Sequence, residues 1–105
     1  MLSVSFRLTV DARADVQAIW RYTVSAWGEK QAEIYLGRIA EACVKLNQNS
    51  NLGKLLPQLS PDIRCFRCEH HFIFYLEDRG GVIFIAFLHE RMDIVSRLIH
   101  RLEQP

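Results

Sequence analysis

Two helical patterns meet at residues 24–31, which read Val24-Ser-Ala-Trp-Gly-Glu-Lys-Gln31. Before the glycine, apolar residues recur every three or four positions, which predicts a helix from about Val10 to Ala26. After the glycine, the same spacing predicts a second helix from about Glu29 to Gln48. Gly28 marks the break, because glycine commonly follows the last residue of a helix. About two residues join the helices, so we expect antiparallel neighbours that form a helical hairpin.

The residues before the hairpin alternate between apolar and polar. This period of two predicts a half-buried strand over Leu2–Leu8. Thr9 is suited to cap the first helix, and Asp11 and Asp15 are favourable near its positive N-terminal end.

The residues after the hairpin favour turns and strands. Asparagines and prolines predict irregular structure over residues 47–61. The next residues predict three strands, with a turn at Asp78-Arg-Gly-Gly81, over about Ile63–Cys68, His71–Glu77 and Val82–Leu88. The last of these is apolar on both faces, which indicates a central strand. Apolar residues at helical spacing between Arg91 and Leu102 predict a short terminal helix.

The resulting order, β-α-α-β-β-β-α, predicts an α+β fold. In it a helical hairpin packs on a small, mostly antiparallel sheet, and residues 1–105 form a single domain. We expect the second face of the sheet, or the groove beside it, to be open to a partner.

Composition excludes several classes of protein. The 13 basic and 12 acidic residues give a net charge of +1, so we expect no direct nucleic-acid binding through phosphates. The longest apolar run has seven residues and the N-terminus lacks a signal-peptide pattern, so we expect no membrane association. Three cysteines fit a cytoplasmic protein better than a disulfide framework. An uncovered apolar face would allow a homodimer of the free chain.

Few residue patterns indicate chemistry. His71, Tyr75 and His89 are candidate general acids and bases for phosphodiester cleavage, with structural roles as the alternative. Cys65 and Cys68 resemble half of a zinc site. Residues three apart on a strand point to opposite faces, however, so we expect no bound metal and no cofactor.

Two groups of residues are candidates for partner binding. Aromatic residues on the helices, including Trp20, Trp27 and Tyr35, either pack in the core or anchor a partner. The last 15 residues are basic through Arg91, Arg97, His100 and Arg101, which either complement a helix dipole or bind an acidic partner.

Four short motifs together resemble a known family. They are Ile19-Trp-Arg-Tyr-Thr23, Trp27-Gly-x-x-Gln-Ala-x-x-Tyr35, His71-Phe-Ile-Phe-Tyr75 and Leu88-His-Glu-Arg-Met-Asp93. In this order and spacing they are similar to the ParE branch of the ParE/RelE toxin superfamily. Family members often carry a basic residue two or three positions before the Leu-His pair, where this chain has Ala86 and Phe87.

The resemblance implies a toxin of a type II toxin–antitoxin module that inhibits DNA gyrase by binding and is neutralised by a ParD-like antitoxin. The target-binding residues would be His89, Arg91, Asp93, Arg97 and Arg101. The antitoxin-binding residues would be Trp20, Trp27 and Tyr35. One alternative is a RelE-like ribosome-dependent ribonuclease that uses His71, Tyr75 or His89. A second is an antitoxin-binding relative that has lost toxicity.

Overall fold

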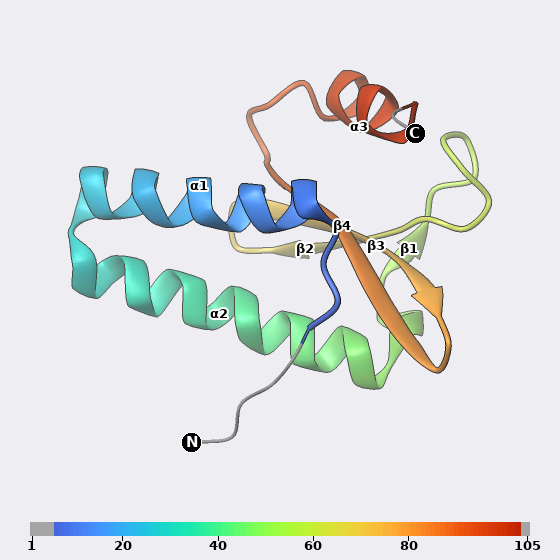
Figure 1. Cartoon of the computed structure of the whole chain (residues 1–105), viewed down its shortest axis with the longest axis horizontal. Coiled ribbons are helices and arrows are strands. Elements are labelled where there is room, and N and C mark those ends of the chain that lie inside the picture. The colour runs from blue at the N-terminus through green and yellow to red at the C-terminus, as the bar shows by residue number, and fades with distance from the viewer. Residues whose placement is uncertain (1–5, 104–105) are drawn as a thin grey trace.

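The computed structural model describes residues 6–103 and has the expected α+β architecture, with helices on both faces of an antiparallel sheet (Figure 1). The elements in chain order are α1 (Val10–Trp27), α2 (Glu29–Gln48), the 3-10 helix η1 (Ser50–Leu52), β1 (Lys54–Leu55), β2 (Arg64–Cys68), β3 (His71–Asp78), β4 (Gly81–His89) and α3 (Ile94–Leu102).

The helical hairpin begins and ends as the sequence predicts. The Thr9 hydroxyl accepts a hydrogen bond from the Ala12 amide at 3.1 Å, which caps α1. Gly28 has a φ of 94°, in the region that favours glycine, and its amide donates to the Val24 carbonyl at 2.9 Å. Because the next helix starts at Glu29, this single glycine reverses the chain.

The sheet has the order β1-β2-β3-β4, and each of these pairings is antiparallel. β1 lies in the stretch that the sequence analysis expected to be irregular. Tyr75 explains why this short strand forms. Its buried hydroxyl accepts from the Gly53 amide at 2.8 Å and donates to the Ser50 carbonyl at 2.7 Å. These two bonds hold the chain beside β2, where Lys54 pairs with Cys65.

The prediction that β4 is a central strand was wrong, because β4 is the last strand of the sheet. Its outer edge is covered by the chain that precedes α1. The Phe84 amide donates to the Arg7 carbonyl at 2.9 Å, and the Thr9 amide donates to the Phe84 carbonyl at 3.0 Å. Leu8 makes only one parallel bridge, to Phe84. Residues 2–5 of the strand expected over Leu2–Leu8 lie outside the described residues.

Each face of the sheet has its own apolar core. The hairpin face includes Ile39, Leu46, Ile73, Tyr75 and Phe84. The other face joins α3, through Leu98, to a cluster from the sheet and the preceding loop, namely Ile63, Phe74, Ile85, Ala86 and Leu88. This second face was expected to be open to a partner, but α3 and residues 56–63 cover part of it. Within residues 6–103, no helix is long and apolar enough to cross a membrane.

Candidate functional site

The C-terminal surface consists of the turn after β4 and the exposed part of α3. The Glu90 amide donates to the His70 carbonyl at 2.8 Å, and the Met92 amide donates to the His89 carbonyl at 3.0 Å. Asp93 then caps α3, since its carboxylate accepts from the Ser96 amide at 3.3 Å. The role of Asp93 in the structure is thus to start the helix.

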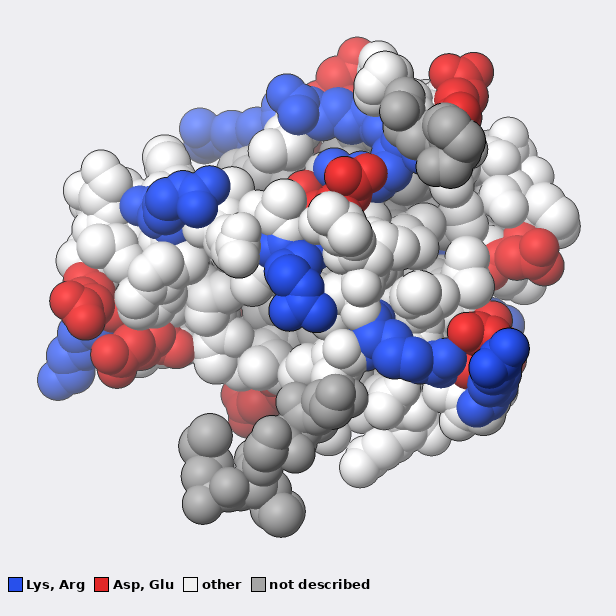
Figure 2. All heavy atoms as spheres, in the orientation of Figure 1, with Lys and Arg blue, Asp and Glu red and all other residues white. Residues whose placement is uncertain are grey.

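Arg91 and Arg97 are exposed on this surface. No ion pair within residues 6–103 involves either guanidinium group. Figure 2 shows positive and negative side chains interspersed over the face in view, in keeping with a net charge of +1. The two arginines are therefore isolated cations, and they suit a local contact with an acidic partner better than a long phosphate backbone.

Arg101 has a different role from the other two arginines. Its guanidinium group donates to both carboxylate oxygens of Asp15, at 2.6 and 3.1 Å, and to the Ile85 carbonyl at 3.2 Å. The hydrogen bonds that Arg101 donates to the Asp15 carboxylate raise the pKa of Arg101. This half-buried pair fastens α3 to α1 and β4. The Arg101 guanidinium group is thus engaged within the chain, and its role in target binding stays a prediction.

Asp15 also completes the edge of β4, because its carboxylate accepts from the Phe87 amide at 2.9 Å. The sequence analysis assigned Asp11 and Asp15 only to the helix dipole. Their spacing of four residues places both on one face of α1, and Asp11 also lies near Arg101, at 3.8 Å. That spacing in the sequence indicated that a cationic side chain would lie beside the two carboxylates, but it could not identify Arg101 as that residue.

A cluster of histidines lies where β3 and β4 end. His71 pairs with His89 across the strands, with ring centroids 5.0 Å apart, and His70 stacks on His89 at 6.3 Å. The Tyr35 hydroxyl lies 2.6 Å from His71 Nδ1 and accepts from the His70 amide at 3.2 Å. Burial, together with His89 and His70, lowers the pKa of His71 to about 4. Burial also raises the pKa of Tyr35.

The structure does not bring the three acid–base candidates together. His71 and Tyr75 share a face of β3, as expected, but they are about 13 Å apart along the strand at 3.3 Å per residue. Tyr75 is fully buried and its hydroxyl is engaged with Gly53 and Ser50. Only His71 and His89 are in contact, and His71 is 7% exposed.

The sequence analysis missed Glu90 and Arg67, which lie beside this cluster. Glu90 lies 2.8 Å from His70 Nδ1 and also accepts from Arg67, and both contacts lower the pKa of its carboxyl group. The adjacent residues His70 and His71 in the sequence indicated that histidines gather here. The sheet register, which places His71 opposite His89, was needed to predict the full cluster.

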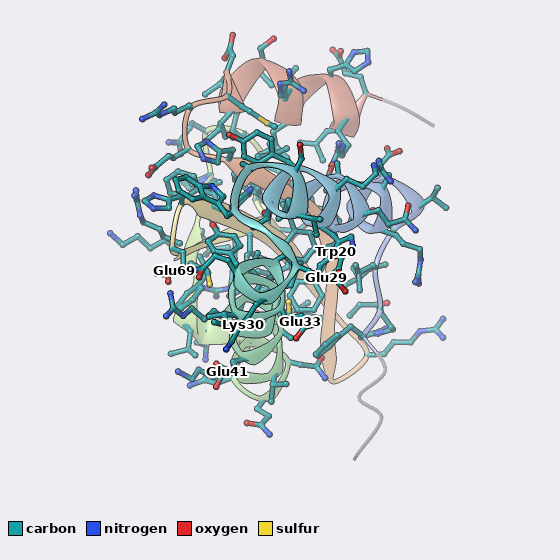
Figure 3. The ribbon with its side chains drawn as sticks, turned by 90° about the vertical axis from the view of Figure 1, so that its left-hand side faces the viewer. Trp20, Glu29, Lys30, Glu33, Glu41 and Glu69 are labelled. Carbon is teal, nitrogen blue, oxygen red and sulfur yellow. The ribbon has the colours of Figure 1, made fainter. Side chains whose placement is uncertain are left out.

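The aromatic candidates differ in exposure. Trp27 is 71% exposed at the end of the hairpin, and Tyr22, one turn away on the same helix, is 68% exposed. Trp20 and Tyr35 are partly buried. Figure 3 views this end of the molecule and shows Glu29, Lys30 and Glu33 around the start of α2. Trp27 is therefore the aromatic residue best placed to enter a partner's surface.

A hollow of about 370 Å³ lies between α2 and β2. Arg38 in this hollow is paired with Glu69. Its lining is of mixed charge and comprises Arg38, Glu41, Ala42, Lys45, Phe66, Arg67, Cys68 and Glu69. It lies where the hairpin meets the sheet.

The two cysteines of the possible zinc half-site point to opposite faces of β2. Cys68 packs against the hairpin core and Cys65 against the other core. Burial raises the pKa of both thiols, that of Cys65 to about 11. Over residues 6–103, no group of three or more His, Cys, Asp or Glu side chains is arranged to hold a metal ion.

Comparison with known proteins gives consistent matches. The family model described as "ParE toxin of type II toxin-antitoxin system, parDE" matches residues 6–94. The chain is 37% identical over 100 residues to Toxin ParE of Escherichia coli, covering 94% of this chain and 97% of that protein. It is 30% identical over 98 residues to Toxin ParE1 of Mycobacterium tuberculosis, covering 92% and 100%. A structure titled "Chromosomal ParDE TA system from P. aeruginosa" aligns with a TM-score of 0.69 at 23% identity, covering 82% of this chain and 95% of that one.

Proposed function

Because this chain belongs to the ParE toxin family of type II toxin–antitoxin systems, we propose that it inhibits DNA gyrase by binding and is neutralised by a ParD-like antitoxin. The relatives are bacterial, and we place this activity in the bacterial cytoplasm. The inhibitor acts as a ligand of its target, and turns over no substrate.

The C-terminal surface carries the gyrase proposal. Arg91 and Arg97 are exposed and held in no ion pair within residues 6–103. The pair of Arg101 with Asp15 holds α3, which carries Arg97, while Arg91 lies in the turn before this helix. His89 supports the turn, because its Nδ1 accepts from the Arg91 amide at 3.1 Å. Two exposed cations of this kind favour an acidic surface through electrostatic complementarity.

The antitoxin surface is proposed on the helical hairpin and on the β1 edge of the sheet. An extended peptide can pair with an uncovered strand edge, and β1 ends the sheet with Leu55 47% exposed. The adjoining hollow carries side chains of both charges, which suits a polar peptide segment. Trp27, Trp20 and Tyr35 extend this surface along the hairpin, with exposed Trp27 as the main anchor.

The ribonuclease alternative has less support from the geometry. A general acid or base must reach the proton that it transfers. Tyr75 is buried with its hydroxyl engaged, and His71 is buried with a pKa near 4. Of the three residues proposed for cleavage, only His89 is half exposed.

The alternative of a non-toxic relative rested on Ala86 and on the small net charge of +1. This residue is fully buried in the cluster that α3 covers through Leu98. A basic side chain there would enter an apolar contact, which is costly for a charge. Alanine at this position therefore has a packing explanation in this chain, and it does not by itself imply lost toxicity.

The decisive experiment is a plasmid supercoiling assay with purified gyrase, with ribosome-dependent RNA cleavage measured in parallel. We expect inhibition by the wild type and at least tenfold weaker inhibition by Arg97→Glu. The control is Arg13→Glu, which reverses another exposed arginine, on α1 at about 200° around the helix from Asp15. RNA cleavage with gyrase unaffected, or equal inhibition by Arg97→Glu and wild type, would contradict the proposal.

A further inference from the structure

Residues 90–93 form the turn that joins β4 to α3 (Figure 1). Two amides of this turn bond back to His89. The Met92 amide donates to the His89 carbonyl at 3.0 Å, and the Arg91 amide donates to His89 Nδ1 at 3.1 Å. The acceptor of the second bond is a ring nitrogen, so this bond exists only while that nitrogen carries no proton. The position of Arg91 therefore depends on the protonation state of one side chain.

The bond to Arg91 also defines the state of the His89 ring. A neutral imidazole has one nitrogen that accepts and one that donates. Because Nδ1 accepts from the Arg91 amide, the proton of the neutral His89 ring lies on Nε2. A protonated ring carries hydrogen on both nitrogens, and its Nδ1 hydrogen would face the hydrogen of the Arg91 amide. Protonation of His89 therefore breaks this contact.

The neighbouring histidines respond differently to acid. His70 Nδ1 lies 2.8 Å from the Glu90 carboxylate, which only accepts, so this bond persists when the His70 ring is protonated. Burial, together with His89 and His70, lowers the pKa of His71 to about 4, so that His71 stays neutral in mild acid. Within residues 6–103, His89 is thus the member of this cluster whose protonation in mild acid removes a hydrogen bond from the turn.

The surroundings of His89 carry charges of both signs, and the ring is open to solvent. Histidine is the side chain that ordinarily changes its charge between pH 5 and 8. His89 is half-buried at the end of β4, so water can deliver the proton. The titratable and charged groups that face the cluster from the elements beside it are Asp15 of α1, Tyr35 of α2, Arg67 of β2, His70 before β3, His71 of β3 and Glu90 of the turn.

We propose that His89 is a proton-sensitive switch in the C-terminal surface: its neutral ring holds the Arg91 amide, and its protonated ring releases it. The bonds of the Glu90 and Met92 amides go to backbone carbonyls, which do not titrate in this range, so these bonds persist. The change is therefore confined to the Arg91 part of the turn, and α3 stays in place. The switch belongs to the chain itself and does not depend on which partner binds this surface.

Nuclear magnetic resonance of the full chain, labelled with nitrogen-15, tests the switch without gyrase or antitoxin. At pH 8 we expect a nitrogen–nitrogen coupling across the hydrogen bond from the Arg91 amide to His89 Nδ1, and a neutral ring with its proton on Nε2. Towards pH 5 we expect the coupling to disappear as the ring gains its proton, with the Arg91 amide resonance shifting at the same midpoint. An unchanged Arg91 amide beside a protonated ring, or a His89 ring that stays neutral throughout, would overturn the proposal.

Two variants separate His89 from its neighbours. His89→Asn replaces the ring with a carbonyl oxygen that can accept from the amide two residues on and takes up no proton, so the Arg91 amide resonance should stay in place between pH 5 and 8. The matched control is His70→Gln, because His70 also contacts His89 but bonds Glu90 rather than Arg91. The Arg91 titration should persist in this control. A titration that survives His89→Asn, or that His70→Gln abolishes, would refute the assignment to His89.

Discussion

The contact between Arg101 and Asp15 allows a quantitative prediction, because its two partners are not equivalent. Asp15 accepts two hydrogen bonds from Arg101 and one from the Phe87 amide, whereas the other bond of Arg101 goes to the Ile85 carbonyl. Loss of Arg101 leaves Asp15 with the Phe87 bond. Loss of Asp15 leaves the Phe87 amide without its acceptor, and it leaves the guanidinium group with the Ile85 carbonyl and the more distant Asp11.

The expected costs follow from this asymmetry. The side chains of Arg101 and Asp15 are 24% and 15% exposed, so the pair is only partly buried. Removing one partner of a fully buried ion pair costs about 3–5 kcal/mol, and a buried group left unsatisfied costs about 1–3 kcal/mol. We expect Arg101→Ala to lower the free energy of unfolding by about 1–2 kcal/mol, and Asp15→Ala by about 2–4 kcal/mol.

Urea denaturation at neutral pH measures both values, and the double variant gives the coupling energy. The matched control is Arg7→Ala, since the pair of Arg7 with Asp78 is 42% exposed on both sides and should contribute less than about 1 kcal/mol. Equal costs for Arg101→Ala and Asp15→Ala, or a cost for Asp15→Ala no larger than that of the control, would refute this reasoning.

Three further predictions concern other parts of the molecule. Tyr75→Phe removes a buried hydroxyl that accepts from the Gly53 amide, and should lower the free energy of unfolding by about 1–2 kcal/mol in thermal melts; an unchanged melting temperature would contradict it. The pKa of His71 is about 4 in the folded chain and about 6.5 in the unfolded chain. Stability should therefore fall as pH drops through this window, because the unfolded state binds the extra proton, and His71→Gln should flatten this part of the profile. Trp27→Ala should weaken antitoxin binding about tenfold in calorimetry without changing the melting temperature, since the side chain is 71% exposed; unchanged affinity would remove Trp27 from that surface.

The helical hairpin could be predicted because its signals are local. Thr9, Gly28 and the apolar spacing act within one or two turns, and both helices begin where the sequence analysis places them. β4 shows the limit of such signals. The apolar sequence of β4 predicts that both of its faces are buried, which is correct. The same sequence does not indicate which strands lie beside β4 in the sheet. β1 has two exposed residues and no pattern, and it depends on a hydroxyl group twenty residues further along the chain.

The candidate site was harder to predict because its groups come from distant parts of the chain. Arg91, Arg97 and Arg101 look alike in the sequence. Among the residues that the structure describes, only Arg101 forms an ion pair, and its partner Asp15 is 86 residues away. The pairing of His71 with His89 likewise requires the register of the sheet.

α3 links the stability of the chain to its proposed binding function. A helix of nine residues is too short to be stable alone in water, so α3 exists because Leu98 and Arg101 hold it on the sheet. Any partner that binds Arg97 therefore depends on Asp15, which is paired with Arg101. It follows that Arg97→Glu should weaken gyrase inhibition at unchanged stability, whereas Asp15→Ala should weaken both. If Asp15→Ala lowered stability and left inhibition intact at a temperature where the chain stays folded, the surface that acts on the target would lie outside α3.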